Sequence, residues 1–162
     1  MDQVDRIIKQ WNDARPELDT LTTGPLARLT RISKAILTRE ERNSMKYGIN
    51  IAGFDVLSAL RRSGKPYALS AGDLLNSMMI TAGTMTNRID QLVKAGLVER
   101  VAAPEDARKT IVQLTDNGFD VIETLIVDHL DTQRTLMAGL TSAEIEQLDN
   151  LLRKLAVSVE SA

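Results

Sequence analysis

The stretch PYALSAGDLLNSMMITAGTMTNRIDQLVKAGLVERVAAPEDARKTIVQLT, residues 66–115, decides the fold. Ser70 is a favourable helix N-cap, and the apolar residues after it predict a short helix over 70–78. After a break, apolar residues at helical spacing predict a second helix over 81–95, which Gly96 ends. Two helices this close together along the chain are typical of a helix-turn-helix.

A β-hairpin is predicted directly after the second helix. Residues 97–103 contain alternating apolar positions and suit a strand, 104–107 suit the tip, and 109–114 suit the return strand. The order helix, turn, helix, hairpin predicts a winged helix-turn-helix. In that fold the second helix enters the major groove of DNA, and the hairpin reaches the neighbouring backbone or minor groove.

Amphipathic helices are predicted on both sides of this lobe, at residues 4–14, 24–48, 51–62, 115–136 and 141–159. We therefore expect a mainly α chain with a small β-hairpin (α+β), folded as a single domain over 1–162. Within it, 49–115 form the winged lobe, and 1–47 and 116–162 supply dimerisation helices. The terminal helices have more apolar surface than the small lobe can cover, which favours packing against a second subunit. The alternative is a monomeric helical bundle.

The composition excludes several classes of function. The 162 residues are 43% hydrophobic and 26% charged, which suits one globular domain. The chain has no cysteine and only one histidine, His129, so thiol chemistry is excluded and no metal site is expected. Without a Gly-rich phosphate loop or a nucleophile with its base, we expect no catalytic residues and no enzyme. An acidic N-terminal stretch and the absence of a long apolar run predict a cytoplasmic protein with no membrane partner.

Charge is distributed unevenly along the chain, although the net charge is only −2. Between residues 61 and 110, eight basic residues outnumber five acidic ones. From residue 116 to the end, three basic residues accompany nine acidic ones. The predicted winged lobe is thus the part of the chain suited to phosphate, and the C-terminal helices are not.

The predicted second helix has a polar face. At about 100° per residue, Met85 and Ile89 fall on its apolar stripe, whereas Asn87 and Gln91 fall opposite, where base edges and phosphates would lie. In the hairpin, the guanidinium of Arg108 suits the electronegative minor groove. The residues expected to contact double-stranded DNA are Ser70, Gly83, Thr84, Thr86, Asn87, Gln91, Arg108 and Lys109.

Asp106 precedes Arg108 by two residues and is placed to orient its guanidinium through a salt bridge; the alternative is a solvated surface pair of little energetic value. Asp106-x-Arg108 followed by Leu114-Thr115 resembles the wing signature of the MarR family of transcriptional regulators. The order of the predicted helices agrees over nearly the whole chain. The resemblance implies a homodimer that binds pseudo-palindromic operators and represses neighbouring genes until a small ligand releases it.

Four separate segments resemble the urate-responsive branch of that family; they are residues 11–19, 54–57, 85–90 and 96–100. In that branch a tryptophan, an aspartate and two arginines line a ligand pocket. By motif they correspond here to Trp11, Asp55, Arg88 and Arg100, which implies a small anionic effector such as urate and no other cofactor. Guanidinium groups suit an anion, and indole stacks on a planar ring. Without the resemblance, Trp11 is interpreted as a dimer-core anchor and the charged residues as salt-bridge partners.

Two other functions stay open at this stage. A general MarR-type regulator would bind a phenolic or hydrophobic ligand in an apolar crevice and would not depend on Arg88 or Arg100. A winged helix can also bind protein instead of DNA. The salt dependence of binding distinguishes a DNA-binding protein from a protein-binding one, because binding through phosphates weakens steeply as the salt concentration rises.

Overall fold

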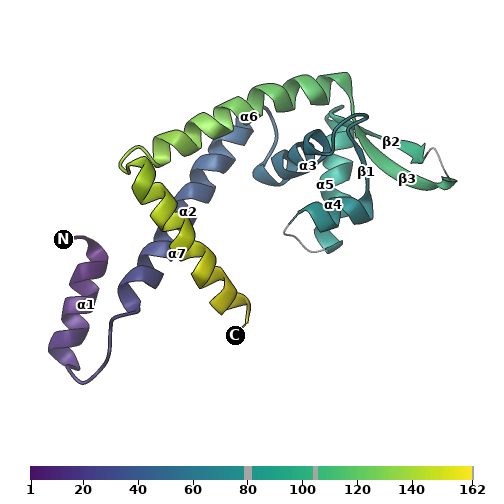
Figure 1. The fold of residues 1–162 in the computed structure, drawn as a ribbon. Coiled ribbons are helices and arrows are strands. Elements are labelled where there is room, and N and C mark those ends of the chain that lie inside the picture. Colours follow the sequence, from purple (N-terminus) through teal and green to yellow (C-terminus); the bar gives the residue numbers. More distant parts are fainter. Residues whose placement is uncertain (79–81, 104–105, 162) are drawn as a thin grey trace. The chain divides into compact units, whose positions relative to one another are not determined.

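A computed structural model describes residues 1–78, 82–103 and 106–161, without the side chains of 82–84, 103 and 106–109. Its contacts divide the chain into two compact units, 1–42 and 43–162. Figure 1 shows the elements, whose bounds are α1 Gln3–Ala14, α2 Thr23–Met45, α3 Ile51–Arg62, β1 Ala68–Ser70, α4 Ala71–Ser77, α5 Ala82–Lys94, β2 Val98–Ala103, β3 Asp106–Leu114, α6 Asp116–Leu136 and α7 Ser142–Glu160. The expected mainly α chain with a small antiparallel sheet is confirmed.

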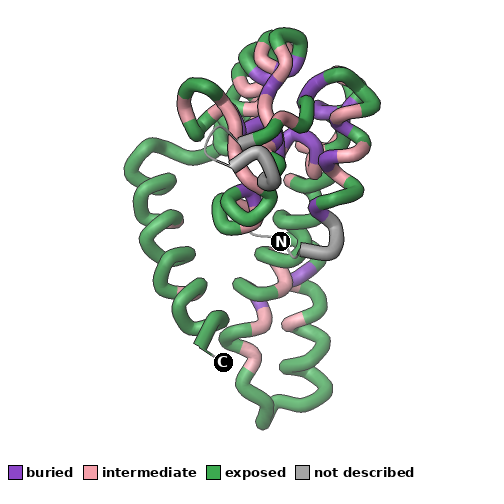
Figure 2. The backbone as a smooth tube through the Cα atoms, turned by 90° about the vertical axis from the view of Figure 1, so that its right-hand side faces the viewer, coloured by how far each residue is buried: buried purple, intermediate pink, exposed green. Residues whose placement is uncertain are grey.

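The core of the second unit is built on α3. Its Val56, Leu57 and Leu60 are fully buried, and apolar residues of α4, α5, the sheet and the first half of α6 pack around them. Helix α7 is different, because none of its residues is buried. Figure 2 shows the buried positions gathered in the lobe and the C-terminal helix exposed along its length. The second unit therefore has one packed lobe and a helix with little cover.

Hydroxyl side chains cap three helices, and the cap at Ser70 confirms the one that the sequence predicts. The hydroxyl of Ser70 accepts a hydrogen bond from the backbone at the start of α4, that of Thr115 does so for α6, and that of Thr141 for α7. At α7, Glu144 completes the capping box by accepting from the Thr141 backbone N–H at 2.8 Å. Thr81, the first residue of the predicted second helix, lies outside the described residues. Local hydrogen bonding thus sets where these helices begin.

The hairpin differs from expectation in two ways. β3 begins at Asp106, so the strand includes two residues that were assigned to the tip, and Ala103 pairs with Asp106 across an irregular register. In addition, a short third strand, β1, pairs with β3 and places Leu69 opposite Val112. The sheet order is β1-β3-β2, with the wing hairpin joined to the start of the helix-turn-helix.

The junction between α5, the wing and α6 is unusually close. The backbone N–H of Thr115 donates to the Leu97 carbonyl at 3.2 Å, and the Thr115 hydroxyl donates to the Gly96 carbonyl at 2.7 Å. A Cβ added at Gly118, in the first turn of α6, would lie 1.8 Å from that same Leu97 oxygen. Only glycine therefore fits at position 118.

In the first unit, two arginines of α2 bind α1, and Arg31 donates to the Gln3 side chain at 2.6 Å. Arg28 of α2 forms ion pairs with Asp2 and Asp5, which also cap the first turn of α1. The hydrogen bond from Arg28 lowers the pKa of Asp2 to about 2. The two carboxylates thus serve both as the helix cap and as the contact to the neighbouring helix.

The Gly118 contact makes a stability prediction. Gly118→Ala should lower the free energy of unfolding by about 3 kcal/mol, because the new methyl group displaces backbone rather than a flexible side chain. Gly139→Ala is the matched control, since a Cβ there meets nothing within 4 Å. Urea unfolding followed by circular dichroism measures both. Equal stability of the two variants would contradict the close contact.

Candidate nucleic-acid interface and effector cavity

The face of α5 predicted to meet DNA is only partly described. Thr86 and Asn87 are exposed, and both precede Arg88, whose side chain is half-buried. Gly83 and Thr84 lie in the first turn of α5, but their side chains are outside the described set. Exposed polar side chains on a helix of this motif suit hydrogen bonding to base edges.

The other predicted DNA contacts lie on the two strands that border the wing. Ser70 ends β1, where its hydroxyl donates to the Asp73 carboxylate at 2.7 Å and accepts from the Asp73 backbone N–H. The structure thus places Ser70 as the cap that orients α4. Arg108 and Lys109 lie within β3, and their side chains, like the predicted Asp106–Arg108 pair, are outside the described residues.

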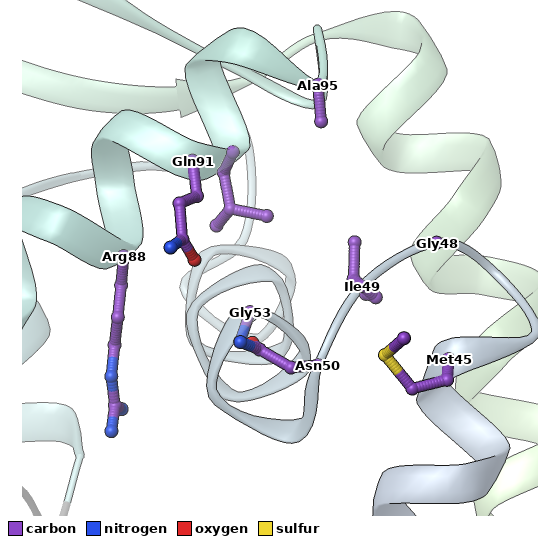
Figure 3. Close-up of a pocket in the computed structure, with 9 residues that line it drawn as sticks. Met45, Gly48, Ile49, Asn50, Gly53, Arg88, Gln91 and Ala95 are labelled. Carbon is purple, nitrogen blue, oxygen red and sulfur yellow. The ribbon is translucent and has the colours of Figure 1, made fainter.

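A cavity of about 270 Å³ lies between α5, the start of α3 and the segment that joins α2 to α3. The lining residues are Met45, Gly48, Ile49, Asn50, Gly53, Arg88, Gln91, Leu92 and Ala95. Figure 3 shows Gln91 extending from α5 toward the first turn of α3, Arg88 extending from α5 alongside α3, and Ile49 and Met45 on the other side. The space suits a ligand smaller than a typical drug molecule, such as one or two fused rings.

Arg88 is the charged group of this cavity. Its Nη1 is buried and has no hydrogen-bond partner among the described residues. A buried guanidinium donor without an acceptor costs about 1–3 kcal/mol or more, because it has lost water and gained nothing. The lining contains no carboxylate that would neutralise it. An anion bound here would therefore meet an available cation.

The four residues that the resemblance implies are not brought together in this lining. Arg100 of β2 instead pairs with Asp90 of α5, with Nη2 2.6 Å from the carboxylate oxygen. Asp55 lies half-buried on α3 and does not line the cavity. Trp11 belongs to the first compact unit and is half exposed. Of the four, only Arg88 lines the cavity; the ligand role of the others stays a prediction.

Two polar side chains of the lining, Asn50 and Gln91, were not assigned to a ligand from the sequence. Asn50 caps α3 by accepting a hydrogen bond from the Gly53 backbone N–H at 2.8 Å. Gln91, expected on the DNA face, lines the cavity beside Arg88. An asparagine three residues before a glycine at a helix start signals the cap, but nothing in the sequence shows that a cavity lies beside it.

Other kinds of site were sought in the described part of the chain. No group of three or more histidine, aspartate or glutamate side chains there could hold a metal ion. Over the same residues, no helix is both long enough and apolar enough to cross a membrane.

Comparison with known proteins assigns the chain to a family. A family model described as the MarR family matches residues 47–109, which include the helix-turn-helix and most of the wing. The HTH-type transcriptional regulator PecS of Dickeya dadantii (strain 3937) is 34% identical over 150 residues, covering 93% of this chain and 90% of PecS. The chain belongs to the MarR family. Members of this family are DNA-binding regulators and not enzymes, as the composition indicated.

Solved MarR-family structures share the fold. BpsR of Bordetella bronchiseptica, whose DNA binding is regulated by 6-hydroxynicotinic acid, is 27% identical, with a TM-score of 0.71 over 86% of this chain and 96% of BpsR. A cysteine-to-serine mutant of MarR from Escherichia coli, complexed with operator DNA, is 26% identical, with a TM-score of 0.70 over 90% and 96% of the two chains. This MarR-family protein is accordingly a transcriptional regulator that binds DNA.

The exposed face of α5 makes a DNA-binding prediction. Asn87→Ala should weaken specific operator binding by about 1–3 kcal/mol, because one base-edge contact is lost. Asn150→Ala, on the exposed surface of α7, should leave operator binding unchanged. Electrophoretic mobility shifts on the upstream region of the gene measure both. If Asn87→Ala binds as tightly as the parent, Asn87 does not contact a base.

Proposed function

We propose that this MarR-family protein is a homodimeric repressor whose DNA binding is attenuated by a small anionic ligand such as urate. One observation supports an anionic ligand. Nη1 of Arg88 is buried, has no hydrogen-bond partner among the described residues, and lies beside a cavity of about 270 Å³. A carboxylate or other planar anion would accept from this guanidinium in a charge-assisted hydrogen bond.

The position of Arg88 links the ligand to DNA binding. Arg88 directly follows Asn87 on α5, so the ligand-facing and DNA-facing side chains are consecutive residues of one helix. The opposite wall of the cavity is the segment from Met45 to Asn50, which continues α2 into α3. An anion held between these walls would fix the orientation of α5, and with it the orientation of Asn87. DNA binding would then fall because the ligand favours one orientation of α5 over the one that fits the groove.

The homodimer is supported by the uncovered terminal helices. In α7, Ile145 and Leu152 are exposed although they share one helix face with the half-exposed Leu148 and Leu155. In α2, Leu26, Leu29 and Ile32 are also exposed. Exposed apolar stripes of this kind favour a self-complementary contact with a second copy. A two-fold dimer would place two α5 helices about 34 Å apart, on the half-sites of a pseudo-palindromic operator.

One relative supports ligand control. BpsR, which shares the fold, has its DNA binding regulated by 6-hydroxynicotinic acid, a small planar acid. The same class of ligand suits a cavity whose one charged lining residue, Arg88, is a cation. The alternative, a phenolic or hydrophobic ligand in an apolar crevice, would leave the guanidinium of Arg88 unpaired and is therefore less favoured.

Removing the cation should remove the response to the anion. For Arg88→Gln, titration calorimetry should find urate binding at least about 10-fold weaker than for the parent, because a charge-assisted hydrogen bond is worth roughly 1.5–3 kcal/mol. In mobility shifts, urate should release DNA from the parent and not from the variant. Lys94→Gln is the matched control, since it removes the same charge from an exposed position of α5.

The outcomes separate the candidate functions. If the protein shifts its operator DNA and no anion affects that mobility shift, the protein is a DNA-binding regulator without an anionic ligand. Equal urate affinity in Arg88→Gln and the parent would place the ligand elsewhere. A specific complex should also weaken by about 10³-fold or more between 50 and 200 mM salt if six phosphates are contacted. Insensitivity to salt would favour the protein-binding alternative.

The dimer has its own test on α7. Leu152→Glu should raise the dimer dissociation constant on the order of 100-fold, because it places a charge in an apolar contact that occurs twice. Asn150→Glu adds the same charge about 200° away around the helix and should leave the dimer intact. Sedimentation velocity measures both. A monomeric parent protein at micromolar concentration would refute the homodimer.

A further inference from the structure

Three polar side chains line the effector cavity, and they differ in what they offer a ligand. Arg88 has only donors. Asn50 has both kinds of group, but its Oδ1 already accepts from the Gly53 backbone N–H at 2.8 Å, so this side chain is held in the helix cap with one of its two oxygen lone pairs in use. Gln91 is exposed, no partner for its carboxamide is found among the described residues, and Figure 3 shows it directed toward the first turn of α3. Among the described lining side chains, Gln91 alone offers a donor together with a free amide acceptor.

From this inventory we infer that Gln91 is a specificity-determining residue that pairs with a lactam edge, the adjacent N–H and C=O of a heterocyclic ligand, while Arg88 holds the ligand's negative charge. A carboxamide and a lactam form two antiparallel hydrogen bonds, since each supplies one donor and one acceptor. A phenol or a plain aromatic acid cannot complete this pair. The role of Gln91 rests on the anionic effector proposed above.

The remaining walls agree with a flat ring. Met45, Ile49, Leu92 and Ala95 supply apolar surface, and the volume of about 270 Å³ limits the ligand to one or two fused rings. Asn50 adds a donor at the N-terminal end of α3, suited to a second carbonyl of the ligand. The ligand class is therefore a planar, anionic heterocycle with at least one lactam group.

The spacing of Arg88 and Gln91 on α5 means that Gln91 would also affect how ligand binding orients this helix. Arg88 and Gln91 are three residues apart and lie on neighbouring positions of one helix face. A ligand that binds both side chains holds α5 at two points, whereas an anion on Arg88 alone leaves the helix free to rotate about that contact. The lactam pair is thus expected to determine which anions bind tightly.

The test compares two planar bicyclic anions, urate, which has lactam edges, and 2-naphthoate, which has none. Affinities for the full-length protein are measured by titration calorimetry without DNA. In Gln91→Leu, the urate dissociation constant should rise about 10- to 100-fold, whereas that of 2-naphthoate should change less than about 3-fold, because an unmatched hydrogen-bond pair discriminates strongly. Gln147→Leu, on the exposed surface of α7, should change neither affinity.

Each result decides a different claim. If Gln91→Leu weakens both anions equally, or neither, lactam recognition by Gln91 is wrong while the anionic effector stands. If the parent binds neither anion, the proposed effector and the role of Gln91 both fail. Leucine favours helix at an exposed position, and circular dichroism confirms that the variant is folded. Arg88→Gln provides the contrast, because it should weaken both anions.

Discussion

The contact of Gly118 with the Leu97 carbonyl is the constraint on which the DNA-binding lobe depends. At this point the end of α5, the start of β2 and the first turn of α6 meet, and no side chain fits between them. Thr115 closes the junction by donating from its backbone to Leu97 and from its hydroxyl to Gly96. Because Thr115, which directly follows β3, also caps α6, the angle of the wing and the direction of α6 are set together.

The opposite side of the lobe is fixed by the side chain of Arg61. Its guanidinium carbon lies 5.2 Å from the ring centres of both Tyr67 and Phe119, and its Nε donates to Glu123 at 2.5 Å. The hydrogen bond that Arg61 donates to Glu123 raises the pKa of Arg61 above its ordinary value. α3, the segment before β1 and α6 are thereby joined by one cation. Both junctions hold the frame against which α5 packs, so the proposed change in the orientation of α5 would take place relative to that frame.

Features that depend on residues close together in the sequence could be predicted, whereas features that depend on distant residues could not. The caps at Ser70, Thr115 and Thr141 depend on residues three apart, so their sequence pattern is sufficient. β1 was missed because a strand of three residues exists only through its pairing with β3, more than 40 residues later. The DNA role of Gln91 stays a prediction, because a helical wheel places a residue only relative to the apolar stripe of its own helix. The wheel contains no information about the segment from Met45 to Asn50, so it could not show that Gln91 lines a cavity.

The energies of single hydrogen bonds explain why the proposed response to a ligand needs more than one polar contact in the cavity. Satisfying the orphan donor of Arg88 contributes about 1–3 kcal/mol. To change a two-state equilibrium from 99:1 to 1:99, a ligand must prefer one state by about 5.5 kcal/mol. Arg88 alone therefore gives a partial response, and the difference has to come from further contacts such as those with Asn50 and Gln91. In the proposed dimer two equal sites contribute to this difference in binding free energy. If both subunits change together, each subunit has to supply only about half of it. Contacts count toward this preference only where they form in one orientation of α5 and not in the other. On that condition, a lactam pair and one charge-assisted bond per subunit reach that amount, whereas a plain carboxylate on Arg88 reaches it only at the upper end of its range.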